Sequence, residues 1–130
     1  MKHILAPILI ALTFSVMFSS TSFAGWTKVT VSLKGNTFYV DFRRIKKDRG
    51  YVYWWEMQNL LKPDKDGDLS YSGYHQGDCK LFRVKYLKFF FYKESMGNGL
   101  GRTNTPKNPK WHYPRPNSSG KTILKSVCSR

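Results

Sequence analysis

A stretch of 15 residues, CKLFRVKYLKFFFYK from 79 to 93, constrains the fold of this chain more than any other. It contains five Lys or Arg residues, several large aromatic residues and no acid, so it must serve both a core and a basic surface. Its first half alternates as a β-strand does, with apolar and basic side chains on opposite sides. The apolar side holds Phe82, Val84 and Tyr86, and the basic side holds Arg83 and Lys85.

The alternation changes phase after Tyr86. The next apolar residues are Leu87, Phe89 and Phe91, with Lys88 between them. A continuous strand would need a β-bulge at this point to keep its apolar face inward, and a break into two strands is the alternative. The choice decides whether Lys88 shares a face with Lys85.

The first 24 residues predict a cleaved secretory signal. A Lys stands near the start, an apolar run follows from Ile4 to Phe18, and small residues occupy Ser22 and Ala24. The apolar run is too short for a membrane span and precedes a cleavage pattern. We therefore expect a single domain over residues 25–130 with no transmembrane segment, and no cysteine stands directly after residue 24 to carry a lipid anchor.

The two cysteines of the chain, Cys79 and Cys128, both follow this signal. An even count in an exported chain predicts one disulfide, and two free thiols are the alternative. A bond that closes a loop of roughly 50 residues contributes up to ~4 kcal/mol in the chain-entropy model. Such a bond would join the terminal segment to the start of the basic stretch.

Positive charge concentrates in the carboxyl half. The formal net charge is +14, and residues 79–130 hold twelve basic residues and one acid, whereas residues 25–78 hold nine and seven. Such a field attracts polyanions, although it also keeps a protein soluble. We expect a protein or polyanionic partner and no specific nucleic acid, because no nucleic-acid-binding motif accompanies the charge.

Apolar alternation predicts four strands before the basic stretch, separated by turns rich in Gly, Asn, Asp and Lys. In the third of them Tyr51, Tyr53, Trp55 and Met57 share one face. The expected strands cover residues 28–33, 38–43, 51–57 and 69–78, with turns at 34–36, 46–50 and Gln76–Gly77. We expect Trp54 to be more exposed than Trp55, and we favour core or dimer packing over a carbohydrate platform for this aromatic strand.

Three segments carry weaker signals. Asp64, Asp66 and Asp68 have the spacing of calcium-loop ligands, but Leu69 stands where that loop needs Gly, so we expect a solvated turn and no metal site. Residues 96–120 are rich in Gly and Pro and predict a long irregular loop. Residues 117–128 predict a short amphipathic helix that begins at Asn117, Ser118 or Ser119.

Catalytic groups are sparse. His75, His112 and Glu56 together with basic residues could form a small secreted nuclease, which we keep as an alternative function. Two isolated histidines in aromatic-rich sequence are more often structural than an acid–base pair. We therefore expect no catalytic residues and no cofactor.

Scattered motifs through residues 25–128 resemble the surface-adhesin protein E family of Gram-negative bacteria. They are GWTKV, NTFYVDF, the pair Trp54 and Trp55, GDCK, Met96-Gly97 and SSGKTILKSVC. The resemblance implies an antiparallel sheet of about six strands with a carboxyl-terminal helix, and it agrees with the α+β fold of five to six strands that the residues predict. It also implies a surface protein that binds host extracellular-matrix and plasma proteins and that dimerises.

These observations predict an exported, non-enzymatic binding module, periplasmic, secreted or surface-associated in a Gram-negative bacterium. Its partner would be a protein or an acidic polymer of the extracellular matrix or the envelope, held by the basic carboxyl half. The candidate ligand-binding residues are Lys80, Arg83, Lys85 and Lys88. A structural envelope protein that forms homodimers through its aromatic surface is a further alternative, beside the nuclease.

Overall fold

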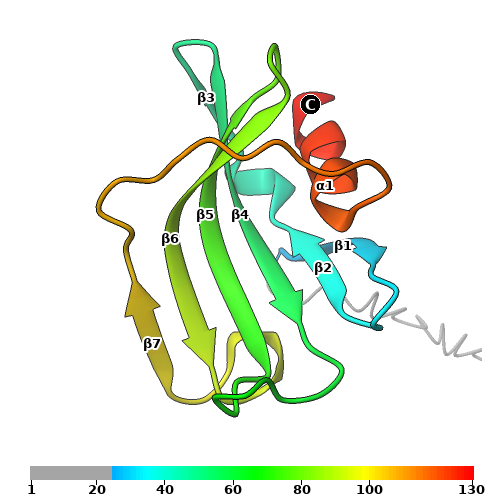
Figure 1. Ribbon diagram of the computed structural model, residues 1–130, viewed down its shortest axis with the longest axis vertical. Coiled ribbons are helices and arrows are strands. Elements are labelled where there is room, and N and C mark those ends of the chain that lie inside the picture. Colours follow the sequence, from blue (N-terminus) through cyan, green and yellow to red (C-terminus); the bar gives the residue numbers. More distant parts are fainter. Residues whose placement is uncertain (1–24) are drawn as a thin grey trace, which may run out of the picture.

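The computed structural model describes residues 25–130, so the predicted signal over residues 1–24 lies outside the described residues. One antiparallel sheet has the order β1-β2-β4-β5-β6-β7, and β3 pairs with one end of β4 (Figure 1). This arrangement confirms the predicted α+β fold. The elements are β1 (Thr27–Val31), β2 (Thr37–Val40), β3 (Lys46–Asp48), β4 (Tyr51–Asn59), β5 (Ser70–Asp78), β6 (Arg83–Tyr92), β7 (Gly101–Asn104) and α1 (Ser119–Cys128), with 3₁₀ turns η1 (Phe42–Arg44) and η2 (Ser95–Gly97).

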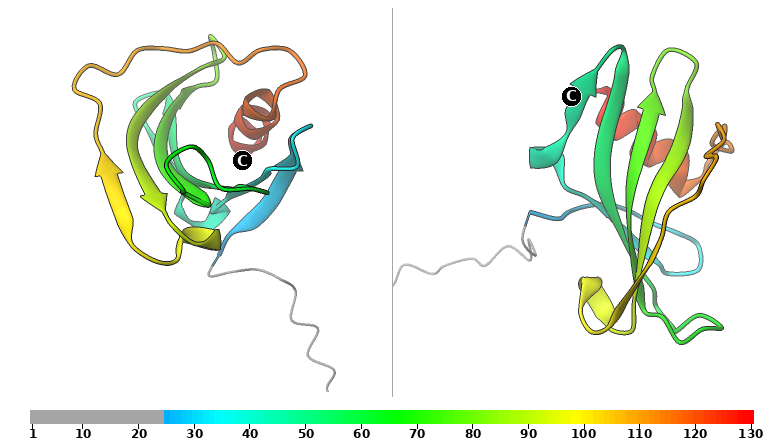
Figure 2. Two further views of the ribbon diagram at one scale, coloured as in Figure 1. Left: turned by 60° about the horizontal axis from the view of Figure 1, so that its bottom comes forward. Right: turned by 90° about the vertical axis from the view of Figure 1, so that its left-hand side faces the viewer.

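The sheet curls around α1, which lies on its concave side (Figure 2). We call the concave face, which carries Trp54, the inner face, and its reverse, which carries Trp55, the outer face. Side chains of β2, β4 and β6 meet the apolar side of the helix to form the core. The buried members are Val40, Val52, Trp54, Val84, Ile123, Leu124 and Val127. Burial of this apolar set is the main force that holds the helix on the sheet.

The helix begins where the sequence predicts. Ser118 is its N-cap, and the Ser118 hydroxyl accepts a hydrogen bond from the backbone N–H of Lys121. Its last residue, Cys128, forms the predicted disulfide with Cys79, with 5.7 Å between the Cα atoms. No helix within residues 25–130 is long and apolar enough to span a membrane.

The predicted turn at Gln76–Gly77 is wrong, and the basic stretch opens with a turn instead. β5 continues to Asp78, so no turn forms at Gln76–Gly77, and the chain reverses at residues 79–82. β6 therefore begins at Arg83, and Cys79 lies in the turn before it. Phe82 has a φ of 53° in this turn, which places it outside the regular alternation of the strand.

Two short strands replace predicted loop. Lys46–Asp48 pairs with the start of β4 as β3, and the reversal there falls at Arg49 and Gly50, which have φ of 52° and 85°. β7 lies within the predicted irregular segment and pairs with the carboxyl end of β6. Residues 105–118, which we call the strap, then cross the open side of the sheet to α1 (Figure 1).

Candidate functional site

A β-bulge in β6 decides where its lysines point. Tyr74 of β5 pairs with Lys88 and His75 pairs with Tyr86, so Leu87 has no partner. Of the two alternatives that the sequence left open, the bulge is the one that forms, because β6 is continuous. One extra residue reverses the phase of the alternation, so Lys85 and Lys88 both lie on the outer face.

Arg83 and Lys80 lie near the turn between β5 and β6. The Arg83 guanidinium donates to Asp78 from 3.0 Å, and the same carboxylate accepts the backbone N–H groups of Lys80 and Leu81. The backbone N–H of Leu81, assisted by Arg83, holds the pKa of Asp78 below its usual range. Arg83 thus helps to fix the turn, whereas Lys80 is exposed in the turn itself.

Aromatic rings from three strands form a cluster on the outer face beside these lysines. The ring of Tyr74 lies 6.0 Å from that of Tyr53 and 5.0 Å from that of Trp55, and Trp55 lies 5.8 Å from Phe90. We call these four residues the outer aromatic cluster. The Lys88 ammonium lies 5.1 Å from the Phe90 ring, within the range of a cation–π contact.

Trp111 from the strap joins this face, and sequence reasoning did not single it out. Its ring lies 4.3 Å from the Arg83 guanidinium and 4.6 Å from the Lys85 ammonium, and 5.6 Å from the ring of Tyr51. A large aromatic residue inside a Pro-rich loop was the available signal, because such a residue usually packs on something. The structure therefore brings Arg83, Lys85 and Lys88 together on one face with aromatic rings, and leaves Lys80 apart from them.

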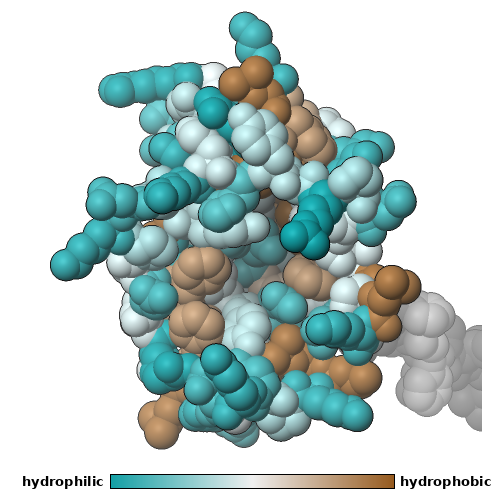
Figure 3. Space-filling model, viewed as in Figure 1, coloured by the Kyte–Doolittle hydropathy of each residue, from teal (hydrophilic) through white to brown (hydrophobic). Residues whose placement is uncertain are grey.

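The inner face carries a second feature, a cleft with a volume of about 660 Å³, which we call the inner cleft. It is lined by the inner face of β4, β5 and β6, by the strap and by the first turn of α1. The space-filling view of this side shows a hollow near its centre, with hydrophilic side chains projecting around the rim (Figure 3). Cavities of this size suit a small organic ligand.

Glu56 and His75 form a pair in this cleft. Trp54 is 1% exposed, which contradicts the prediction that it is the more exposed tryptophan, and its indole N–H donates to Glu56 Oε1 from 3.0 Å. His75 Nε2 lies 3.3 Å from the same oxygen. Gly73 permits this approach, because a Cβ at that position would lie 2.5 Å from His75 Nε2. Burial lowers the pKa of His75, while the charge of Glu56 raises it by less.

The three residues named for a nuclease do lie around one cleft. Tyr86 separates the two histidines, with ring centroids 4.9 Å from His75 and 5.0 Å from His112. His75 is only 3% exposed, however, and Glu56 is engaged by the Trp54 indole. A general base must reach a substrate proton, so this packing favours a structural or binding role over acid–base catalysis.

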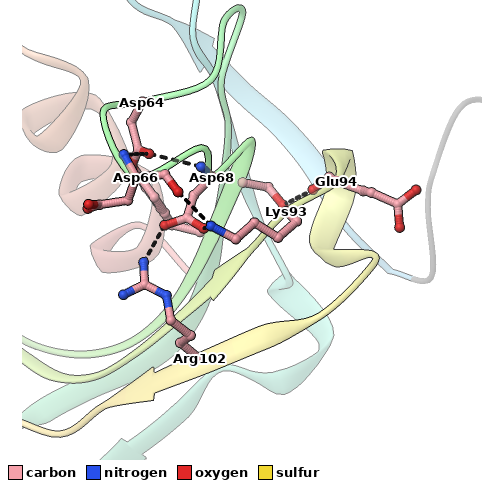
Figure 4. Close-up of polar contacts among 8 residues, drawn as sticks. Asp64, Asp66, Asp68, Lys93, Glu94 and Arg102 are labelled. Atoms are coloured by element: carbon pink, nitrogen blue, oxygen red, sulfur yellow. Dashed lines mark hydrogen bonds and ion pairs between the residues drawn. The ribbon is translucent and has the colours of Figure 1, made fainter.

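Internal contacts already engage the carboxylates of Asp64 and Asp68 in the calcium-like loop (Figure 4). Their carboxylate oxygens lie within 4.8 Å of one another. Asp68 is 1% exposed and forms ion pairs with Lys93, at 3.2 Å, and with Arg102. Asp64 accepts a hydrogen bond from the Tyr71 hydroxyl. These contacts hold the loop between β4 and β5 in place, which explains why its aspartates lie close together.

Comparisons with known proteins agree with this architecture. The crystal form II structure of Haemophilus influenzae protein E has a TM-score of 0.59 at 20% identity, covering 82% of this chain and 89% of that one. A structure of protein E from non-typeable Haemophilus influenzae has a TM-score of 0.55 at 15% identity, covering 85% of this chain and 76% of that one. At identities this low, the structural similarity shows a shared fold alone.

No curated protein sequence matches this chain. A family match is nevertheless clear, because residues 26–129 match the family described as surface-adhesin protein E, which covers nearly all of the described residues. The sequence motifs, the curled antiparallel sheet and the carboxyl-terminal helix agree with that match. The chain therefore belongs to the surface-adhesin protein E family.

Proposed function

We propose that this chain is an exported, adhesin-like binding module whose outer face binds an acidic partner. The partner is an acidic protein or a polyanionic polymer of the extracellular matrix or the bacterial envelope. The observation that carries the proposal is the bulge at Leu87, which places Lys88 on the same face as Lys85, beside the outer aromatic cluster. Membership of an adhesin family supports binding over catalysis.

The chemistry of this face suits an acidic surface. Within residues 25–130, neither Lys85 nor Lys88 forms an ion pair with an acid, so both charges are available to a partner. Lysines that lie over aromatic rings are held in place and lose less conformational entropy on binding. The positive field of the carboxyl half would speed the approach of a polyanion.

Chromatography on immobilised heparin, an acidic glycan, tests the proposal. We expect Lys85→Gln/Lys88→Gln to elute at clearly lower salt than the natural chain, and addition of Lys80→Gln and Arg83→Gln to lower it further. The matched control is Lys62→Gln/Lys65→Gln, which removes the same charge from the exposed loop between β4 and β5. Equal effects of the two double variants, or none, would overturn the proposal.

Self-association through the outer aromatic cluster is the second candidate, because its rings are only half-buried. The two functions respond to salt in opposite ways. A homodimer would bring Lys85 and Lys88 of two copies close together, so salt would strengthen it by screening their repulsion, whereas salt weakens an acidic complex. Sedimentation at two salt concentrations distinguishes them, and a monomeric mass at high protein concentration argues against the dimer.

Export and the absence of catalysis are parts of the same proposal. Amino-terminal sequencing of the protein from its host should find Gly25 first, and a chain that retains residues 1–24 would contradict cleavage after Ala24.

A zymogram on RNA and DNA from pH 4 to pH 9 should show no cleavage of either nucleic acid. Any cleavage abolished by His112→Ala would favour the nuclease instead.

A further inference from the structure

Glu56 differs in its partners from the three fully buried carboxylates that the structure describes. Within residues 25–130, Asp41, Asp68 and Asp78 each form an ion pair with a Lys or an Arg. No Lys or Arg in that range pairs with Glu56, although its side chain is only 18% exposed. A carboxylate removed from water without a cation is costly, so its retention in such a basic chain calls for a reason.

His75 does not supply the missing positive charge. It is almost fully buried, and burial lowers its pKa more than the nearby Glu56 raises it, which favours the neutral ring at pH 7. Nε2 faces the Glu56 carboxylate at 3.3 Å, and a neutral ring with its proton on Nε2 leaves Nδ1 as a bare acceptor. Nδ1 has no hydrogen-bond partner in the described part of the chain. Nδ1 is itself buried, so the pair presents to the cleft the negative charge of Glu56 and no free donor.

The walls around this pair are aromatic. The Tyr86 ring lies 4.9 Å from His75 and 5.7 Å from Phe89, and Phe89 lies 6.2 Å from Phe91. The charge of Glu56 also reaches the wall, since burial and then Glu56 raise the pKa of Tyr86. Aromatic faces attract cations, most strongly where water is excluded, and quaternary ammonium groups are bound by such rings.

We propose that the inner cleft binds a small organic cation, an amine or quaternary ammonium group on a compact apolar body, with Glu56 as counter-ion and Tyr86 and Phe89 as walls. The Glu56 carboxylate would repel an anion at close range. A neutral ligand would leave the charge of Glu56 without a partner. The net charge of +14 repels free cations, so the apolar body must provide part of the affinity. The site lies on the opposite face of the sheet from Lys85 and Lys88 and is independent of their function.

Three probes of similar shape test the charge requirement. They are choline, the neutral 3,3-dimethylbutan-1-ol and the anionic 3,3-dimethylbutanoate, titrated into the purified exported protein with its disulfide intact. Nuclear magnetic resonance of the Trp54 indole and the His75 ring reports binding at the cleft. We expect choline to bind at least tenfold more tightly than the neutral probe, and the anion to bind more weakly still. Equal binding of choline and the neutral probe, or preference for the anion, would overturn the proposal.

Variants test whether choline binds beside Glu56. Glu56→Gln keeps an oxygen to accept the Trp54 N–H, and it should weaken choline binding about tenfold without changing the neutral probe. Glu94→Gln is the control, because it removes the same charge from an exposed site outside the cleft. Arg115→Gln, at a cation that lines the cleft, should leave choline binding unchanged or stronger. Loss of choline binding in Glu94→Gln would contradict the site.

A second pair of variants keeps the test valid if Glu56→Gln fails to fold. Tyr86→Phe preserves the aromatic face, whereas Tyr86→Leu removes it from a position that is 38% exposed and therefore tolerant of change. We expect choline binding to survive in the first variant and to weaken severalfold in the second. Equal choline affinity in the two variants would contradict a cation–π wall.

Discussion

Lys85 and Lys88 lie on the same face of β6 although three positions separate them, because Leu87 between them has no partner on β5. In a regular strand the two side chains would point to opposite faces of the sheet. The bulge thus keeps Phe89 and Phe91 on the inner face and sends both lysines to the outer one. A single unpaired residue therefore sets the charge of one face and the apolar wall of the other.

Trp111 should tie the basic residues to the outer face. Replacement by Leu removes the ring that lies under Arg83 and Lys85 but keeps both charges. Each exposed cation–π contact is worth about 0.5–1 kcal/mol, so the free energy of unfolding should fall by about 1 kcal/mol. Urea unfolding measures this loss, and elution from heparin should move to lower salt, though less than in Lys85→Gln/Lys88→Gln.

Trp111→Phe is the matched control, since it retains an aromatic face. It should recover most of the lost stability and the natural elution position. If Trp111→Leu elutes with the natural chain, Lys85 acts without support from the strap.

Local signals in the sequence were sufficient for much of this fold. The change of phase at Tyr86 and Leu87 limited this point to a bulge or a break, and Ser118 with the apolar spacing after it predicted the helix. The cysteine count predicted the disulfide. Each of these features depends on a few neighbouring residues or on the even number of cysteines, which is why a single sequence could reveal it.

The features that were missed depend on contacts between distant segments. β7 has little alternation of its own and forms because the edge of β6 offers hydrogen-bond partners. Trp54 looked more exposed than Trp55 because nothing in β4 shows which face α1 will cover. The pairing of Glu56 with His75 requires the register between β4 and β5, which places Trp54 opposite His75. Tertiary packing therefore decided each of these cases.

Removal of the disulfide should destabilise the domain strongly. Cys79 and Cys128 are 49 residues apart in sequence, and closure of such a loop is worth about 4 kcal/mol in the chain-entropy model. We expect Cys79→Ser/Cys128→Ser to lose stability of this order in urea unfolding. A reductant should destabilise the natural chain by a similar amount and leave the double variant unchanged. A reductant effect on the variant would point to a cause other than this bond.

Acid should weaken the fold through His75. Its pKa in the folded chain lies below the ordinary value of 6.5, so between these two values the unfolded state binds more protons than the folded one. Stability should therefore fall as the pH drops below about 6.5, with a slope of up to about 1.4 kcal/mol per pH unit. Urea unfolding between pH 7.5 and pH 5 measures the slope.

Two variants test whether His75 causes this dependence of stability on pH. His75→Gln should flatten it, although the variant starts from a lower stability because Glu56 and Tyr86 pack around the ring. His112→Gln should keep it, because His112 is exposed. An unchanged slope in His75→Gln would show that another group binds the protons.

Gly77 and Gly120 should respond to alanine in opposite directions. A Cβ on Gly77 would lie 2.7 Å from the Trp54 ring, 2.9 Å from Val52 and 3.0 Å from Leu124, between the sheet and the helix. Overpacking of this kind costs about 1–3 kcal/mol, and these core atoms have little room to move.

Gly120 lies in the first turn of α1, where the nearest side-chain atoms would be 3.8 Å away, so alanine there should add roughly 0.5–1 kcal/mol of stability. Thermal unfolding of both variants measures the difference, and a neutral Gly77→Ala would mean that α1 packs less closely on β5 than the structure shows.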